Sequence, residues 1–324
     1  MKPRRIDLSQ YEQAAEHEEL GLPPLEATVT QVGAHPFRHD LILLVFLPLL
    51  ALVLYLLGLW LLPAGWQPVL TEVSHGLADK AFWLAAGVGL FAQIIDGALG
   101  MAYGITATTF LLTTGVPPAA ASASVHIAEI FTTGFSGISH WRFGNVNKAL
   151  FKRLLIPGMA GAISGAWIIT SVDGDLIKPW ISAYLVVMGL YVLSKAFRHI
   201  KPNKEPPKHV AALALTGGFV DAVGGGGWGP VVTTSLIGTG QDPRTTIGTV
   251  NAAEFFLAIA GGLTFALLIG FTHWQVIAGL VVGGLFAAPF AAWLCSHLHA
   301  RTLLIMVGTI VTLISSFNLW KALA

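Results

Sequence analysis

Long apolar segments alternate with short polar ones from residue 41 to the C-terminus, and they fall into two length classes. Segments of about twenty residues or more can cross the hydrocarbon core of a bilayer as helices. Segments of about fourteen residues are too short to cross it at the helical rise per residue. The short segments form two pairs, 82–95 with 100–114 and 209–223 with 227–240. This pattern predicts an all-α integral membrane protein in which each short pair is a broken or re-entrant helix hairpin.

The longer segments predict one extra N-terminal transmembrane helix and three spanning helices after each hairpin. They lie at 41–62, 117–140, 149–171, 177–197, 244–270, 274–296 and 302–320. Residues 1–40 are rich in charge and contain no long apolar run, so we interpret them as a soluble arm. The predicted parts of the chain are the arm at 1–40, the extra helix at 41–62, and two transporter units at 82–197 and 209–323.

The two units are copies of one ancestral sequence. A shift of 125 residues aligns 96–129 with 221–254 without a gap, and 12 of the 34 aligned pairs are identical. Small apolar residues often agree by chance, but the identical pairs include one pair of aspartates and one pair of glutamates. We conclude that the chain contains an internal duplication.

The positions of lysine and arginine predict how the two units are oriented. Eleven of the 14 basic residues after residue 40 lie in the stretches 142–153 and 195–208 or at Arg244 and Arg301. Cytoplasmic loops of membrane proteins carry an excess of basic residues. If these eleven are cytoplasmic, so is the N-terminus, and the two hairpins enter from opposite faces. The prediction is therefore two repeats of inverted topology.

Composition excludes several classes of function. The chain is 54% hydrophobic and only 11% charged, and its net charge of +1 leaves no basic patch for nucleic acid. Its single cysteine, Cys295, allows neither a disulfide framework nor a thiol metal site. No phosphate-binding loop and no catalytic motif is present. We expect no enzyme activity, no cofactor and no metal, while the oligomeric state stays open.

Glycine-rich breaks at 96–100 and 221–227 join the short segments of each pair. Irregular backbone at membrane depth is tolerated only where protein buries it or where it lines a cavity. Two such breaks at corresponding places of two repeats point to a transport site, and helix N-termini there would suit an anion. The candidate substrate-binding residues at the breaks are Gly100, Gly104, Thr108, Thr109, Gly225, Gly226, Gly227, Gly229, Thr233 and Thr234. Alternatively, the glycines allow close helix packing and the threonines bond to their own helices.

Two further glycine pairs, Gly161 with Gly165 and Gly279 with Gly283, are each spaced four residues apart. This spacing places both glycines of a pair on one helix face, and it predicts close helix crossings rather than chemistry.

Four acids lie inside apolar segments: Asp96, Glu129, Asp221 and Glu254. Charged groups at membrane depth are costly, so function is the default hypothesis for them. A carboxyl group that loses its hydration favours its protonated form, which makes all four candidates for proton coupling. In the structural alternative the aspartates cap the broken half-helices. The glutamates would then bond to the unwound backbone of the other repeat.

One polar residue accompanies each glutamate on the same helix face. His126 precedes Glu129 by three residues, and Asn251 precedes Glu254 by three. We include both in the candidate substrate site. His126 would bond an oxyanion or move protons, whereas Asn251 would only form hydrogen bonds.

The sequence around the breaks resembles a known family. Residues 92–104, AQIIDGALGMAYG, resemble the first signature of the TauE/SafE sulfite exporter family, although Leu99 and Met101 stand where glycines are common. Residues 217–230, GGFVDAVGGGGWGP, resemble its second signature, and the likeness extends over 82–323. The resemblance implies a multi-pass carrier of the cell membrane for sulfite or organosulfonates such as sulfoacetate.

We therefore predict a secondary transporter that exports a small sulfur-containing anion together with protons. The first alternative is a cation carrier or channel in which the four acids are the ligands. The second is a membrane protein without transport activity, either an intramembrane enzyme or a scaffold for partners.

Overall fold

The computed structural model describes residues 4–5, 28–29, 67–99, 101–142, 144–197, 207–270, 273–287 and 300–324. Apart from two short antiparallel strands, β1 (Arg4–Arg5) and β2 (Thr28–Val29), the elements in these ranges are helices. The predicted all-helical class is thus confirmed. The arm at 1–40 is described only at these strands, and the extra helix predicted at 41–62 lies outside the described residues.

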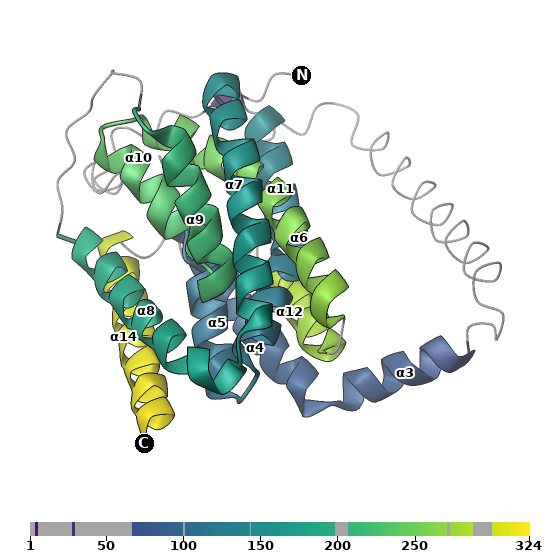
Figure 1. Ribbon diagram of the computed structural model, residues 1–324. Coiled ribbons are helices and arrows are strands. Elements are labelled where there is room, and N and C mark those ends of the chain that lie inside the picture. The colour runs from purple at the N-terminus through teal and green to yellow at the C-terminus, as the bar shows by residue number, and fades with distance from the viewer. Residues whose placement is uncertain are drawn as a thin grey trace.

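The described helices fall into two sets, each with two segments joined at a break and then three further helices (Figure 1). The first set follows a helix α3 (Gln67–Ala78) and comprises α4 (Lys80–Leu99), α5 (Tyr103–Thr113), α6 (Pro118–Arg142), α7 (Lys148–Ser171) and α8 (Gly174–Lys195). The second comprises α9 (Val210–Gly224), the π-helical turn η1 (Gly229–Thr233), α10 (Thr234–Gly238), α11 (Pro243–Ile269), α12 (Trp274–Phe286) and α14 (Ala300–Leu323). By length and composition, α7, α8, most of α11 and α14 from Leu304 can each cross a membrane.

The helix boundaries repeat at the spacing that the duplication predicts. Helix α11 begins at Pro243, 125 residues after α6 begins at Pro118. Helices α12 and α14 begin 126 residues after α7 and α8. The two halves therefore fold into corresponding elements.

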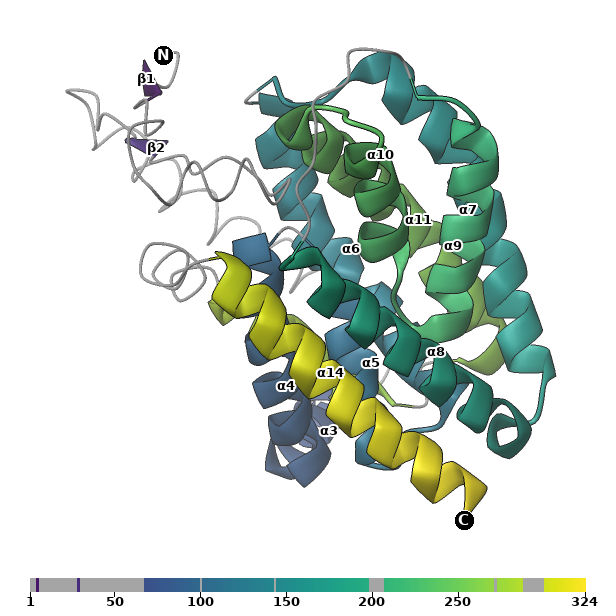
Figure 2. The ribbon, with the colours of Figure 1, turned by 90° about the vertical axis from the view of Figure 1, so that its left-hand side faces the viewer.

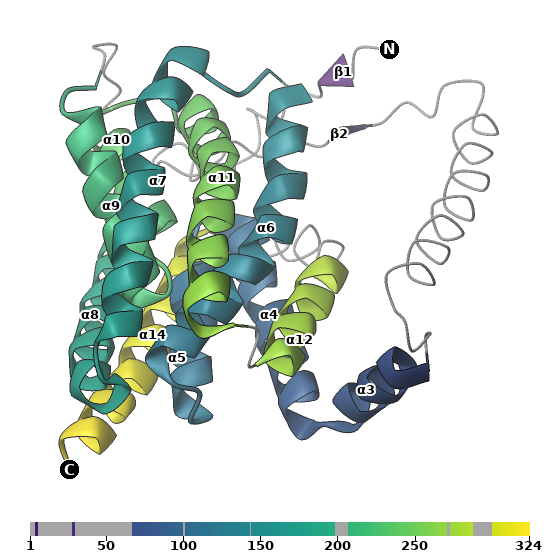
Figure 3. The same ribbon diagram turned by 45° about the vertical axis from the view of Figure 1, so that its right-hand side comes forward.

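Helices of one half pack mainly against helices of the other. Helix α7 packs on α9, and the corresponding helices α12 and α4 also pack on each other. Helices α8 and α14 pack side by side on one face (Figure 2), and α6 lies beside α11 in the central layer (Figure 3). Each of these pairings joins residues from both halves, so neither half buries its apolar surface alone.

The spaced glycine pairs lie at two of these crossings, which confirms their predicted packing role. A Cβ atom on Gly161 would lie 2.7 Å from the Phe219 backbone nitrogen of α9. A Cβ atom on Gly283 would lie 2.7 Å from the Leu90 backbone nitrogen of α4. Because backbones touch at these points, any side chain would force the helices apart.

The hairpins differ from their predicted boundaries. Helix α4 has 20 residues and continues through Asp96 to Leu99, whereas the sequence analysis ended its apolar segment at residue 95. Helix α9 likewise continues to Gly224 and includes Asp221. A single glycine followed by alanine and leucine costs a helix only about 1 kcal/mol, so it does not end one. The breaks therefore start after the aspartates, where the backbone reaches φ 89° at Ala102 and φ 67° at Gly225.

Replacing Gly161 by alanine should destabilise the protein by about 1–3 kcal/mol, because the new methyl group overpacks the α7–α9 crossing. The matched control is Gly87→Ala in α4, where a Cβ atom would meet no atom within 4 Å. Thermal unfolding in detergent measures both. Equal unfolding temperatures for the two variants would contradict backbone contact at this crossing.

Candidate functional site

The two breaks are closed by the same hydrogen bond in each half. The Asp96 carboxylate, in the last turn of α4, accepts from the Tyr103 backbone N–H at the start of α5, at 3.3 Å. The Asp221 carboxylate accepts in the same way from the Trp228 N–H, at 2.8 Å. The first N–H groups of a helix have no partner within that helix. Each aspartate therefore caps the second half-helix from across the break.

The backbone of the second break also receives side chains from the first half of the chain. The Thr108 hydroxyl donates to the Gly225 carbonyl, and the Tyr184 hydroxyl donates to the Gly226 carbonyl at 2.8 Å. The Ser122 hydroxyl donates to the Ala222 carbonyl at 2.6 Å. Unwound backbone needs such partners where water is absent. The second break is thus held by α5, α6 and α8.

The two breaks approach each other closely. A Cβ atom on Gly104 would lie 2.6 Å from Gly226 Cα, so the two backbones touch without an intervening side chain. Gly226 has φ 144°, a conformation that favours glycine. Contact between the two glycines brings the start of α5 against the break that follows α9.

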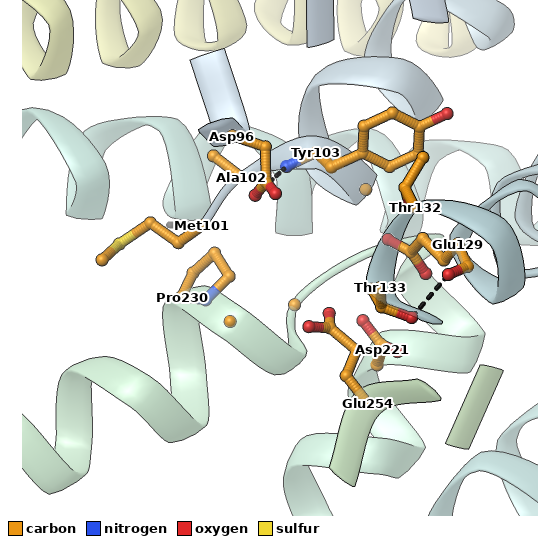
Figure 4. A pocket seen from close by; sticks show the side chains of 13 residues that line it. Asp96, Met101, Ala102, Tyr103, Glu129, Thr132, Thr133, Asp221, Pro230 and Glu254 are labelled. Atoms are coloured by element: carbon orange, nitrogen blue, oxygen red, sulfur yellow. Dashed lines mark hydrogen bonds between the residues drawn. The ribbon is translucent and has the colours of Figure 1, made fainter. Parts of the chain in front are cut away.

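A small cavity lies where the breaks meet (Figure 4). Its volume of about 10 Å³ is close to the space that one water molecule needs. It is lined by Asp96, Met101, Ala102, Tyr103, Gly104, Glu129, Thr132, Thr133, Asp221, Gly227, Gly229, Pro230 and Glu254. Figure 4 shows the carboxyl groups of Glu129, Asp221 and Glu254 gathered on one side, with Asp96 beside Tyr103. All four acids singled out in the sequence therefore surround one cavity.

The candidate glycines at the breaks differ in their position relative to this cavity. Gly104, Gly227 and Gly229 line it, while Gly225 and Gly226 form the adjoining turn. Gly100 lies outside the described residues.

The four candidate threonines are all buried but differ in their contacts. Thr108 bonds to the second break, as described above, whereas Thr109 donates to the Ile105 carbonyl of its own helix at 2.6 Å. The hydroxyls of Thr233 and Thr234 have no hydrogen-bond partner among the described residues. None of the four lines the cavity.

His126 and Asn251 occupy corresponding positions but differ in their contacts. His126 Nε2 lies 3.3 Å from Asp221 Oδ2, and His126 Nδ1 lies 2.9 Å from the Ser122 carbonyl oxygen. The Asn251 side chain instead donates to the Ser136 hydroxyl at 3.0 Å. One ligand atom each from His126, Glu129 and Asp221 lies within 4.8 Å of the other two, so these three could hold a metal ion.

The sequence analysis did not select six of the residues that line the cavity: Met101, Ala102, Tyr103, Thr132, Thr133 and Pro230. Helix periodicity could have found Thr132 and Thr133, because they follow Glu129 by three and four residues on the same helix. The Tyr103 hydroxyl is buried and has no hydrogen-bond partner among the described residues. It is thus a buried hydroxyl without a partner, on a residue that lines the cavity.

Replacing Asp221 by alanine should cost about 1–3 kcal/mol of stability, because the buried Trp228 N–H loses its acceptor. The matched variant Asp221→Asn keeps an oxygen that can accept this bond and should retain most of the stability. Unfolding of both variants in detergent is the measurement. Alanine and asparagine variants of equal stability would show that the cross-break bond does not hold the hairpin.

Comparisons with known proteins place this sequence in a family. The family model described as "Sulfite exporter TauE/SafE" matches residues 85–317. The probable membrane transporter protein YtnM of Bacillus subtilis (strain 168) is 43% identical over 256 residues, which cover 75% of this chain and 85% of YtnM. The probable membrane transporter protein ORF9 of Sinorhizobium sp is 29% identical over 218 residues, 64% of this chain and 80% of ORF9. No solved structure gives a significant match. The chain therefore belongs to the TauE/SafE sulfite exporter family of membrane transporters.

Proposed function

We propose that this transporter exports small sulfur-containing anions, either sulfite or organosulfonates such as sulfoacetate, and couples their movement to protons. The description of its family motivates the choice of anion. The observation that carries the proposal is a cavity at which two broken hairpins from different halves of the chain meet. A cavity shared by two discontinuous helices is the usual form of a secondary transport site.

We further propose that residues 82–197 and 209–323 are repeats of inverted topology. Exchanging the two halves turns the α7–α9 pair into the α12–α4 pair, and it leaves the α6–α11 and α8–α14 pairs unchanged. In Figure 1, α4 and α5 lie in the lower part of the bundle while α9 and α10 lie in the upper part, which supports entry from opposite sides. Such an arrangement would let one repeat rock against the other around the cavity.

The donors near the breaks suit an oxyanion. Backbone N–H groups at helix starts carry partial positive charge, and the hydroxyls of Tyr103, Thr233 and Thr234 have no acceptor among the described residues. However, the aspartates already occupy the N–H groups of Tyr103 and Trp228. An anion in the cavity would therefore have to use the following N–H groups, and it would reach the hydroxyls of Thr233 and Thr234, which do not line the cavity, only after a movement of the hairpin.

Proton coupling follows from the charges that surround the cavity. Ionised carboxylates at Glu129 and Glu254 would repel an anion a few ångströms away, and protonation would remove this repulsion. An anion and protons would then enter the site together and leave it together. Export would then carry protons outward together with the anion. Alternatively, the exported anion would exchange against another anion.

A cation carrier is the second candidate function. It is favoured by the ligand atoms of His126, Glu129 and Asp221, which lie within 4.8 Å of one another. In that case ionised acids would bind the transported ion directly, and no anion would be needed.

Proteoliposomes containing the purified protein should give transient currents on solid-supported membranes when sulfite or sulfoacetate is added, and larger ones with an imposed pH gradient. Sulfate, taurine and chloride serve as comparison substrates. Currents that follow sodium or potassium without any anion requirement would overturn the proposal and favour the cation carrier.

The variants Glu129→Gln and Glu254→Gln should each lower the pH-driven part of this current by at least about tenfold, because glutamine cannot release a proton. The control is Asp175→Asn, since Asp175 lies exposed in the first turn of α8. Full pH-driven transport in both glutamine variants would rule out these glutamates as the coupling groups.

A further inference from the structure

The side chain of His126 has a fixed orientation and a fixed tautomer. Its Nδ1 atom lies 2.9 Å from the Ser122 carbonyl oxygen, which can only accept a hydrogen bond. Nδ1 therefore carries the hydrogen, and the neutral ring presents a lone pair at Nε2. Histidines that bind metals in proteins are held in this way, with the second ring nitrogen donating to a carbonyl or carboxylate.

The lone pair at Nε2 lies opposite a carboxylate oxygen of Asp221, which is also a hydrogen-bond acceptor. Asp221 Oδ2 lies 3.3 Å away, and Nε2 has no hydrogen-bond partner among the described residues. The other oxygen of Asp221 already accepts from the Trp228 N–H, which fixes the orientation of the carboxylate. Two lone pairs at this separation repel each other unless a proton or a metal ion lies between them.

Glu129 supplies the third ligand atom. Its Oε2 atom is buried and has no partner among the described residues, and the side chain is only 3% exposed. His126 is completely buried and Asp221 is 2% exposed. Buried polar atoms without partners cost about 1–3 kcal/mol each, so their convergence on one point indicates a ligand that completes them.

The distance between His126 and Asp221 fits a small metal ion. Zinc binds histidine nitrogen and carboxylate oxygen at about 2.0–2.2 Å, so two ligands of a tetrahedral site lie about 3.4 Å apart. The separation of 3.3 Å between Nε2 and Oδ2 agrees with this geometry, and all three ligand atoms lie within 4.8 Å. Glu254 lines the cavity together with Glu129 and Asp221.

The donor set and the charge select the class of metal. One imidazole nitrogen with carboxylate oxygens suits borderline ions such as Zn²⁺, whereas Ca²⁺ requires six to eight oxygen ligands. A divalent ion also offsets two of the negative charges that four acids would place in this buried region. We propose that His126, Glu129 and Asp221 form a binding site for one divalent transition-metal ion, with Zn²⁺ as the probe.

The site would join the two halves of the chain. His126 and Glu129 belong to α6, whereas Asp221 belongs to α9 next to the second break. A bound metal would tie the second break to α6 and hinder its movement. Zn²⁺ should therefore stabilise the fold and inhibit transport, whichever ion the protein carries. The expectation of no metal from the sequence did not consider this set, since His126 and Asp221 are 95 residues apart and form no local motif.

Isothermal titration calorimetry on the purified full chain in detergent tests the site. After treatment with a chelator and its removal, ZnCl₂ should bind at one site, and CaCl₂ should not compete. His126→Asn and Asp221→Asn should each weaken binding by at least about 100-fold, because loss of an outer-shell partner alone costs about 10–100-fold. Asparagine at 126 matches Asn251 of the other half, and asparagine at 221 can keep the bond to Trp228.

The matched control is His140→Asn, since His140 lies on the same helix and only contacts Asn145 among the described hydrogen bonds. It should bind Zn²⁺ as the unchanged protein does. Elution volume and metal-free unfolding temperature check that each variant is folded. Equal zinc affinity in all variants, or no binding to the unchanged protein at micromolar concentration, would overturn the proposal. The titration contains no transported anion, so its failure is separate from failure of the proposed function.

Discussion

The structure depends on one hydrogen bond that occurs twice, donated by a backbone N–H to an aspartate carboxylate on the other side of a helix break. A broken helix inside a membrane protein leaves several N–H and carbonyl groups without partners, and water is not available to replace them. Asp96 and Asp221 each satisfy the N–H that opens the next half-helix. Because the acceptor comes from the preceding half-helix, the bond also sets the geometry of the break.

The glycines make it possible for the two breaks to meet. Gly104 and Gly226 touch through their backbones, and Gly161 and Gly283 allow the flanking helices to cross closely. The carbonyls of the second break are then within reach of Thr108 and Tyr184 from the first half. The site is thus assembled from both halves, and the arrangement of acids around it follows from the duplication. The difference between His126 and Asn251 breaks this symmetry and gives the two sides of the cavity different chemistry.

Much of this architecture was predictable from the sequence. The duplication, the short segments and the pairing of four acids all appear in the periodicity and the spacing of the chain, and the acids do line one cavity. The exact ends of the half-helices were not predictable, because Asp96 to Leu99 are compatible with both helix and break, and a single glycine is too weak a signal to place the end of a helix. The aspartate bonds match the structural alternative that the sequence offered, in which Asp96 and Asp221 cap the broken half-helices. The approach of His126 to Asp221 escaped prediction, because these residues lie far apart in the chain and only the tertiary packing of α6 on α9 brings them together.

The central claim is that the two breaks meet around one cavity and that the transported anion binds there. Its most direct test is a cryo-electron microscopy map of the protein in lipid nanodiscs, recorded with and without saturating sulfite. The account predicts additional density between the start of α5 and η1, in contact with Gly104 and Gly229 and bounded by the four acids. Density for the anion at another place, or breaks that lie apart in both maps, would contradict it.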